Sequence, residues 1–210
     1  MVRTIIILLF LISIKQNAFC QLDQADNKLC LKIAPLAYLD IYGGMSPRLG
    51  VEYKLKNTLS LYHEIGTYFP NPNGMHQNKG FLIKNELKKY LNKNNLSTGD
   101  YLSAELFYKH QNYFTNDTIS GAYKNYHVSK DAACLTIKYG MLSVIKYNLV
   151  FDVFAGVGLR YKITTSSLTE EENRSIVPNG DYHINVLLNK AGTFIIPNFD
   201  AGIKIGYRLK

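Results

Sequence analysis

The segment LVFDVFAGVGLRYK, from Leu149 to Lys162, alternates between two kinds of side chain. One set is apolar throughout: Phe151, Val153, Ala155, Val157, Leu159 and Tyr161. The other set is small or charged apart from Phe154: Asp152, Gly156, Gly158, Arg160 and Lys162. Successive side chains of a β-strand point to opposite faces, so a period of two indicates a strand. The segment is predicted to be a strand with one apolar and one polar face.

The closing segment, PNFDAGIKIGYRLK, repeats this design. The buried face of a soluble β-sandwich is rarely so rich in glycine and charge. In a transmembrane barrel the apolar face meets lipid, and the small and charged side chains line the lumen. The pattern therefore predicts an all-β fold, a closed antiparallel transmembrane β-barrel. A soluble lipocalin-like barrel is the alternative, and it needs the apolar stripes inward and the charges outward.

Residues 1–20 have the features of a secretory signal peptide. Arg3 precedes an apolar run from Ile5 to Ile14, and small residues stand before a cleavage point at Gln21. The run is too short to span a bilayer as a helix. Lipidation of Cys20 is the alternative, but bulky Phe19 precedes it where a small residue is expected. Residues 21–210 are then the outer-membrane β-barrel domain.

About eight strands are expected in this domain, a number that suits its length. No later apolar run reaches the ~18 residues of a transmembrane helix, so any membrane span must be built from strands. Residues 182–188 either prolong a hairpin above the membrane or add strands, and in the second case the number rises to ten. The alternation places the strands at about 29–42, 48–55, 58–69, 81–91, 101–113, 131–142, 149–162 and 197–210.

Three polar connections, at residues 70–80, 115–130 and 163–195, are predicted to be long loops. The connections after the second, fourth and sixth strands are short. Short turns on the periplasmic side and long loops outside are typical of outer-membrane barrels. Tyrosines near predicted strand ends further predict an aromatic girdle at the membrane interface: Tyr42, Tyr68, Tyr90, Tyr101, Tyr113 and Tyr147. The general preference of tyrosine for strands accounts for part of this signal.

The polar faces carry acids and bases that are expected to point into a narrow lumen. A lumen of about eight strands is filled by side chains or holds one small ligand. Unpaired charges there would be costly to desolvate, so an ion-pair network that plugs the lumen is predicted. The candidates are Glu52, Glu64, Glu86, Glu105, Asp152, Arg160, Asp200, Lys204 and Arg208, with further cations at Arg48, Lys54, Lys84, Lys88, Lys109, Lys138 and Lys162.

The sequence predicts no catalytic, metal or cofactor site. A lipid-modifying barrel enzyme would pair a serine with a histidine. By strand parity, however, Ser60 points inward where His63 points to lipid, and Ser103 and His110 lie on opposite faces. The chain also has His76, His127 and His183, and a lone histidine is more often a surface or interface residue. Cys30 and Cys134 leave a disulfide open, and their spacing indicates no metal site.

The net charge of +8 becomes +6 without residues 1–20, because removing Arg3 and Lys15 leaves 22 bases against 16 acids. The bases are spread through the strands, with no basic arm or recognition helix, which argues against nucleic acid. Attraction to anionic lipid head groups is the alternative meaning.

Four segments resemble a family of small Bacteroidetes-type outer-membrane proteins classed as a domain of unknown function. They are KIAPLAYLDIYGGMSPRLGVEYKLKNTLSL, GFLIKNELKKYL, DVFAGVGLRYK and NFDAGIKIGYRLK, and together they span most of residues 32–210. The family's middle motif has a Pro-Glu-Leu-Arg-Tyr character, where this chain has Asn85, Glu86, Leu87, Lys88 and Tyr90. The chain also ends Leu209-Lys210 rather than on an aromatic residue, and Tyr207 is the nearest substitute. The resemblance implies a fold and a location but no activity.

The expected protein is thus a monomeric, non-enzymatic outer-membrane barrel with a structural or surface-interaction role. It contacts outer-membrane lipid and, through its long loops, an extracellular partner. A narrow pore or small-solute-binding barrel is the first alternative, and a lipid-modifying enzyme is the least favoured.

Overall fold

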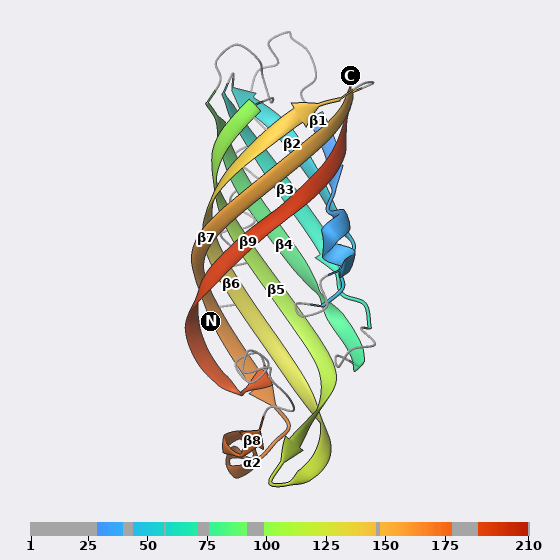
Figure 1. The fold of residues 1–210 in the computed structure, drawn as a ribbon, viewed down its shortest axis with the longest axis vertical. Coiled ribbons are helices and arrows are strands. Elements are labelled where there is room, and N and C mark those ends of the chain that lie inside the picture. Colours follow the sequence, from blue (N-terminus) through green and yellow to red (C-terminus); the bar gives the residue numbers. More distant parts are fainter. Residues whose placement is uncertain are drawn as a thin grey trace.

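The computed structural model describes residues 29–39, 44–56, 58–70, 76–91, 99–145, 148–177 and 189–209. These residues form a closed ring of antiparallel strands, shown in Figure 1. The ring strands are β1 (Leu29–Ile33), β2 (Arg48–Lys56), β3 (Leu59–Thr67), β4 (His76–Tyr90), β5 (Gly99–Ile119), β6 (Ala122–Val144), β7 (Leu149–Ser166) and β9 (Gly192–Leu209). The predicted all-β class and the eight antiparallel strands are confirmed.

Each ring strand pairs with the next one along the chain, and β9 pairs with β1 to close the ring. In Figure 1 the C-terminus lies at one end of the ring, and the β5–β6 hairpin extends beyond the other end. The two-residue strand β8 (Ile176–Val177) pairs with this hairpin through Thr118 and Ile119. The short helix α2 (Glu170–Arg174) lies just before β8. No helix among the described residues is long and apolar enough to cross a membrane.

The side chains of the ring are arranged with apolar groups outside and polar groups inside. Outward residues such as Val157, Leu159 and Phe199 are 60%, 63% and 80% exposed, whereas the inward Glu86 and Asp152 are fully buried. The lipocalin-like alternative requires the opposite orientation. The alternation read from the sequence therefore gives the correct faces for β7 and β9.

The first strand is much shorter than the sequence predicts. In place of one strand over residues 29–42, β1 ends at Ile33 and a 3-10 helix, η2 (Pro35–Leu39), follows. Proline has no N–H to donate to a neighbouring strand, so pairing stops just before Pro35. Residues 40–43 lie outside the described part of the chain.

The prediction of a loop at residues 115–130 is wrong. β5 and β6 continue as paired strands through this segment, from Thr115 opposite Tyr126 to Ile119 opposite Ala122. Ser120 and Gly121 make the turn with φ of 50° and 80°. Two central residues with positive φ form the tight turn whose twist matches a two-residue hairpin.

Two other loop boundaries also differ from prediction. β4 begins at His76 rather than 81, after a register shift between His76 and Lys79 with Gln77 at φ 53°. Part of the loop predicted at residues 163–195 is ordered, because β7 runs to Ser166 and β9 starts at Gly192. The segment 182–188, considered as extra strands, lies outside the described residues, as does the predicted signal peptide.

The tyrosines predicted to form an interfacial girdle point inward instead. Tyr68, Tyr90, Tyr101 and Tyr113 are all at least 96% buried, whereas Tyr42 and Tyr147 are not described. The four share the inward parity of the charged residues around them. The girdle prediction is therefore wrong for these four residues.

Candidate functional site: a charged network inside the ring

Five lysines and five carboxylates form ion pairs inside the ring, as two clusters of four residues and one separate pair, Lys204 with Glu86. We call this set the lumen network; its members are Lys32, Lys84, Lys88, Lys138, Lys204, Glu52, Glu86, Glu105, Asp152 and Asp200. Each member occupies a position of its strand whose side chain points into the ring. Closure of the ring therefore brings together residues that are far apart in the chain. The charges balance one for one.

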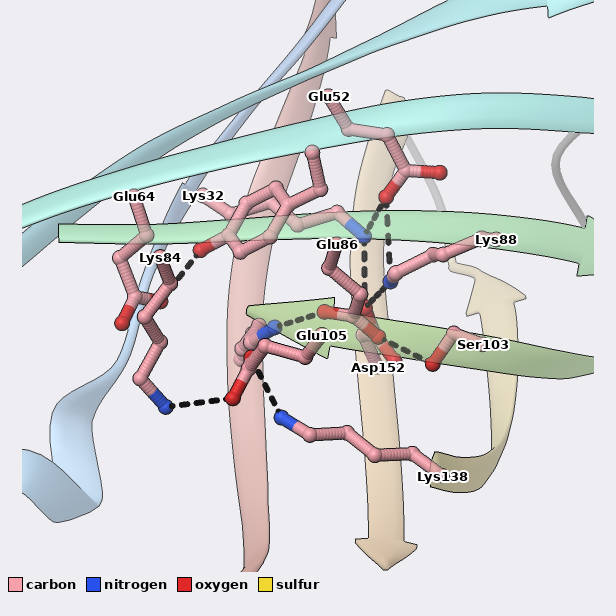
Figure 2. Close-up of polar contacts among 12 residues, drawn as sticks. Lys32, Glu52, Glu64, Lys84, Glu86, Lys88, Ser103, Glu105, Lys138 and Asp152 are labelled. Atoms are coloured by element: carbon pink, nitrogen blue, oxygen red, sulfur yellow. Dashed lines mark hydrogen bonds and ion pairs between the residues drawn. The ribbon is translucent and has the colours of Figure 1, made fainter. Parts of the chain in front are cut away.

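The first four-residue cluster of the lumen network is centred on Asp152. Its Oδ2 lies 2.7 Å from Nζ of both Lys32 and Lys88. The same two ammonium groups contact Glu52 Oε2 at 2.5 and 3.2 Å. Figure 2 shows these four side chains converging from β1, β2, β4 and β7. Two cations and two anions thus neutralise each other where all four are buried.

The second four-residue cluster lies around Glu105 and Asp200. Lys138 Nζ lies 2.6 Å from an oxygen of each of these carboxylates. Lys84 Nζ is 3.5 Å from Glu105 and 3.4 Å from Asp200. Asp200 is the most exposed member of the network, since 24% of its side chain remains accessible. This cluster is therefore the one closest to solvent.

Hydroxyl groups supply the remaining hydrogen bonds of the carboxylates. Glu86 pairs with Lys204 at 2.9 Å and also accepts from a serine hydroxyl. The donors are Ser103 to Glu86 at 2.7 Å, Ser60 and Tyr90 to Glu52 at 2.7 and 2.6 Å, and Tyr101 to Asp152 at 2.6 Å. Buried charges are tolerated when they are both paired and hydrogen-bonded. These carboxylates meet both conditions.

Aromatic rings fill the space between the ion pairs. Lys88 Nζ lies 4.2 Å from the centre of the Tyr101 ring, and Lys138 Nζ lies 4.3 Å from that of Phe154. Such cation–π contacts add stabilisation where the cation is desolvated. The Tyr101 ring lies directly over Gly140 on β6, where a Cβ would stand 2.4 Å from the ring. Because glycine has no side chain, Gly140 leaves the space that the aromatic ring of Tyr101 occupies.

The predicted lumen residues divide into two groups. Nine of them belong to the lumen network: Glu52, Glu86, Glu105, Asp152, Asp200, Lys84, Lys88, Lys138 and Lys204. Glu64 is buried and accepts from Tyr62 at 2.6 Å, but it has no ion pair within 4.0 Å among the described residues. Arg160 contacts the amide oxygen of Asn198 rather than a carboxylate. Arg208 lies on β9 opposite Cys30 of β1.

The sequence reasoning missed Lys32 and the hydroxyl donors. Lys32 lies between Leu31 and Ile33 in β1 and alternates with them. This alternation indicates that Lys32 points inward. The strand is so short that the pattern is easy to overlook. The tyrosine hydroxyls were missed because tyrosine was assigned to the membrane interface.

No histidine ring hydrogen-bonds a serine hydroxyl among the described residues; Ser167 Oγ accepts from the backbone N–H of His127 at 3.1 Å. His63 points outward and contacts Asn85, whereas Ser60 is inside. His110 Nδ1 lies 2.9 Å from Asp131 Oδ1, which also accepts from Tyr108 at 2.6 Å. The described residues also include no group of three or more His, Cys, Asp or Glu side chains that could hold a metal ion. Cys30 and Cys134 are both free thiols.

In comparisons with known proteins, no family model, no curated protein and no solved structure matches the chain.

Proposed function

We propose that the chain is an outer-membrane β-barrel protein with a non-enzymatic, structural or surface-interaction role. The observation that carries this proposal is the orientation of its side chains. Large apolar residues cover the outside of a closed ring, and the charged residues are buried within it. Exposing such a surface to water would be unfavourable, whereas hydrocarbon would solvate it. Pairing of backbone groups around a ring is also what a bilayer demands.

The two ends of the ring differ in a way that supports an outer surface at the β5–β6 end. At the C-terminal end the connections are short, as between β2 and β3 or β6 and β7. At the other end the β5–β6 hairpin projects with α2 and β8 beside it (Figure 1). Lys124 of this hairpin pairs with Glu172 of α2 at 2.6 Å. This hydrogen bond helps to hold the pKa of Glu172 below its ordinary value. Under this proposal the projecting hairpin is the surface that meets an extracellular partner.

The first test is heat-modifiable mobility of the protein from a purified outer-membrane fraction. A folded barrel resists detergent until it is boiled and then migrates differently on a gel. We expect the unboiled protein to migrate as a separate band. Recovery of the protein in the soluble periplasmic fraction, with no change on boiling, would contradict the proposal.

The lumen network predicts a second result, that the purified protein forms no stable conductance in planar bilayers. A lumen of eight strands is only wide enough to be filled by side chains, and under this proposal the paired side chains of the lumen network block the passage of ions. A reconstituted open porin serves as the positive control, and heat-modifiable mobility of the same sample shows that the barrel is folded. A reproducible open channel would favour the narrow-pore alternative instead.

A further inference from the structure

The inner wall of the ring is basic where β5, β6 and β7 approach the projecting hairpin. Residues 107–113, 128–134 and 160–166 of these strands pair in register. Their single acid, Asp131, occupies an outward position of β6. Within these three described ranges, every charged residue at an inward position is therefore a base. We call these bases the basic patch; they are Lys109, Lys130, Arg160 and Lys162.

The same three strands are balanced in charge towards the C-terminal end of the ring. There Lys138 of β6 lies 2.6 Å from Glu105 of β5. Asp152 of β7 is held by Lys32 and Lys88. The lumen network thus compensates its own charges, whereas the basic patch has no acid on its own part of the wall.

Lys130 is the member of the basic patch without a counter-charge in the described structure. It is 98% buried, and no carboxylate among the described residues lies within 4.0 Å of its Nζ. The charged groups that act on it are Lys109, Arg160 and Lys162, all of the same sign. Its Nζ lies 5.1 Å from the centre of the Tyr113 ring. An aromatic ring offsets only part of the cost of burying an ammonium group.

The other bases of the patch contribute charge and have contacts of their own. Lys109 and Lys162 each lie over an aromatic ring and take part in further interactions. Arg160 contacts the amide oxygen of Asn198. Lys130 is therefore the position at which the basic patch needs a counter-ion.

Polar groups without partners lie on the same wall. Thr164 is directly opposite Lys130 in the register of β6 and β7, and it is 98% buried. In the described structure its Oγ1 has no hydrogen-bond partner, and neither do Ser166 Oγ and Arg160 Nε. Buried polar groups are nearly always hydrogen-bonded, so several exceptions beside one buried charge indicate a bound ligand.

The lumen has room for a small ligand next to the basic patch. A cavity of about 260 Å³ adjoins it, since Lys109 and Arg160 are among the lining residues. An eight-stranded ring can hold one small ligand in addition to its own side chains.

We propose that the basic patch binds a small oxyanion with two negative charges, of the sulfate or phosphate class, at Lys130. The ammonium group of Lys130 provides charge-assisted hydrogen bonds, and the hydroxyl of Thr164 is a second donor. Several bases on one buried wall favour a divalent anion over a monovalent one, because each adds a Coulomb attraction. An uncharged solute would leave Lys130 without a counter-charge. The site depends on the closed ring and not on the membrane location.

The test is isothermal titration calorimetry of the purified, detergent-solubilised protein in a buffer free of these anions. Sodium sulfate, sodium phosphate and sodium chloride are the three probes. We expect sulfate and phosphate to bind saturably, with one ion per barrel, and at least about 10-fold more tightly than chloride. A single charge-assisted hydrogen bond contributes on this scale.

Two variants examine the two donors. Lys130→Met should weaken sulfate binding at least about 10-fold, because it removes the charge and keeps a side chain of similar length. Thr164→Val should weaken it roughly 3- to 10-fold, as the loss of an uncharged donor does. Lys89→Met is the matched control, since Lys89 is exposed on the outside of β4. It should bind sulfate as the wild type does.

A second measurement follows the stability of the same proteins without the anions. Replacing an uncompensated buried charge by an apolar side chain is expected to stabilise the folded state. Lys130→Met should therefore unfold at a higher urea concentration than the wild type. Lys89→Met should unfold at the wild-type concentration.

Each contrary result has a distinct meaning. A folded wild-type barrel that binds no sulfate, or binding that Lys130→Met leaves unaltered, would overturn the site. Chloride binding as tightly as sulfate would overturn the assignment to a divalent oxyanion. A Lys130→Met protein less stable than the wild type would show that the charge of Lys130 is already compensated. Heat-modifiable mobility is measured on every sample, so these failures concern the anion site alone. Its absence in the wild type would contradict the barrel itself, and with it both proposals.

Discussion

Asp152→Asn should lower the free energy of unfolding by about 3–5 kcal/mol, the usual cost of leaving buried charges without their partner. The carboxylate of Asp152 is fully buried and is held by Lys32, Lys88 and the hydroxyl of Tyr101. The amide keeps the volume of the side chain but removes the charge. Two lysines then share Glu52 alone. Urea unfolding of the protein in lipid vesicles, followed by heat-modifiable mobility, measures the loss.

Two further variants control this experiment. Glu170→Gln removes an exposed ion pair with Arg174 on α2, where both side chains are more than 70% accessible. No measurable change is expected there, because such pairs contribute little. Adding Lys88→Met to Asp152→Asn should recover part of the loss, since Lys32 and Glu52 then balance. An Asp152→Asn protein as stable as the wild type would contradict a stabilising role for the lumen network.

Val157→Arg should prevent assembly of the protein in the membrane. Val157 is at an outward position of β7 and is 60% exposed, with Leu159 beside it on the same face. A cation near the middle of the bilayer costs about 2–4 kcal/mol in a transmembrane barrel. We expect the heat-modifiable form to disappear from the outer-membrane fraction, as judged by gels of boiled and unboiled samples.

Val157→Leu is the matched control, because it keeps the position apolar and should assemble normally. The comparison separates the effect of charge from that of any change at this site. Normal assembly of Val157→Arg would mean that this stripe does not face hydrocarbon. The proposed membrane location would then need a different basis.

The predictable parts of the fold are those in which polar and apolar side chains alternate locally. β7 and β9 each alternate over most of their length, so their inward and outward residues can be assigned from the amino-acid sequence alone. Nine of the ten network members were predicted as lumen residues from the parity of their strands, and Lys32 is the exception. Strand number is also accessible, because eight alternating segments separated by turn residues are present in the chain.

The sequence analysis mispredicted the β5–β6 hairpin and the position of the tyrosines, because the local pattern of polar residues fits more than one structure. The segment from Thr115 to Lys130 is rich in polar residues where it projects beyond the ring, so it resembles a loop. Its Ser120-Gly121 turn is the signal that could have identified the hairpin, since this pair takes up the positive φ that a tight turn needs. The tyrosines were predicted at the membrane interface instead of the lumen because an aromatic ring with a hydroxyl group suits both environments. Only their parity distinguishes the two.

The alternating sequence is sufficient to establish that this chain forms two-faced strands and which face of most of them is polar, because alternation is a local property of the backbone. Which charges meet is a property of the closed ring. Lys32 and Asp152 are 120 residues apart in the chain, and Lys204 and Glu86 are 118 apart. Their pairing depends on ring closure and strand register, which no local pattern specifies. The tertiary structure likewise decides that β1 is too short to cover β9: within the described part of the chain, β1 pairs with β9 only from Ile205 to Leu209.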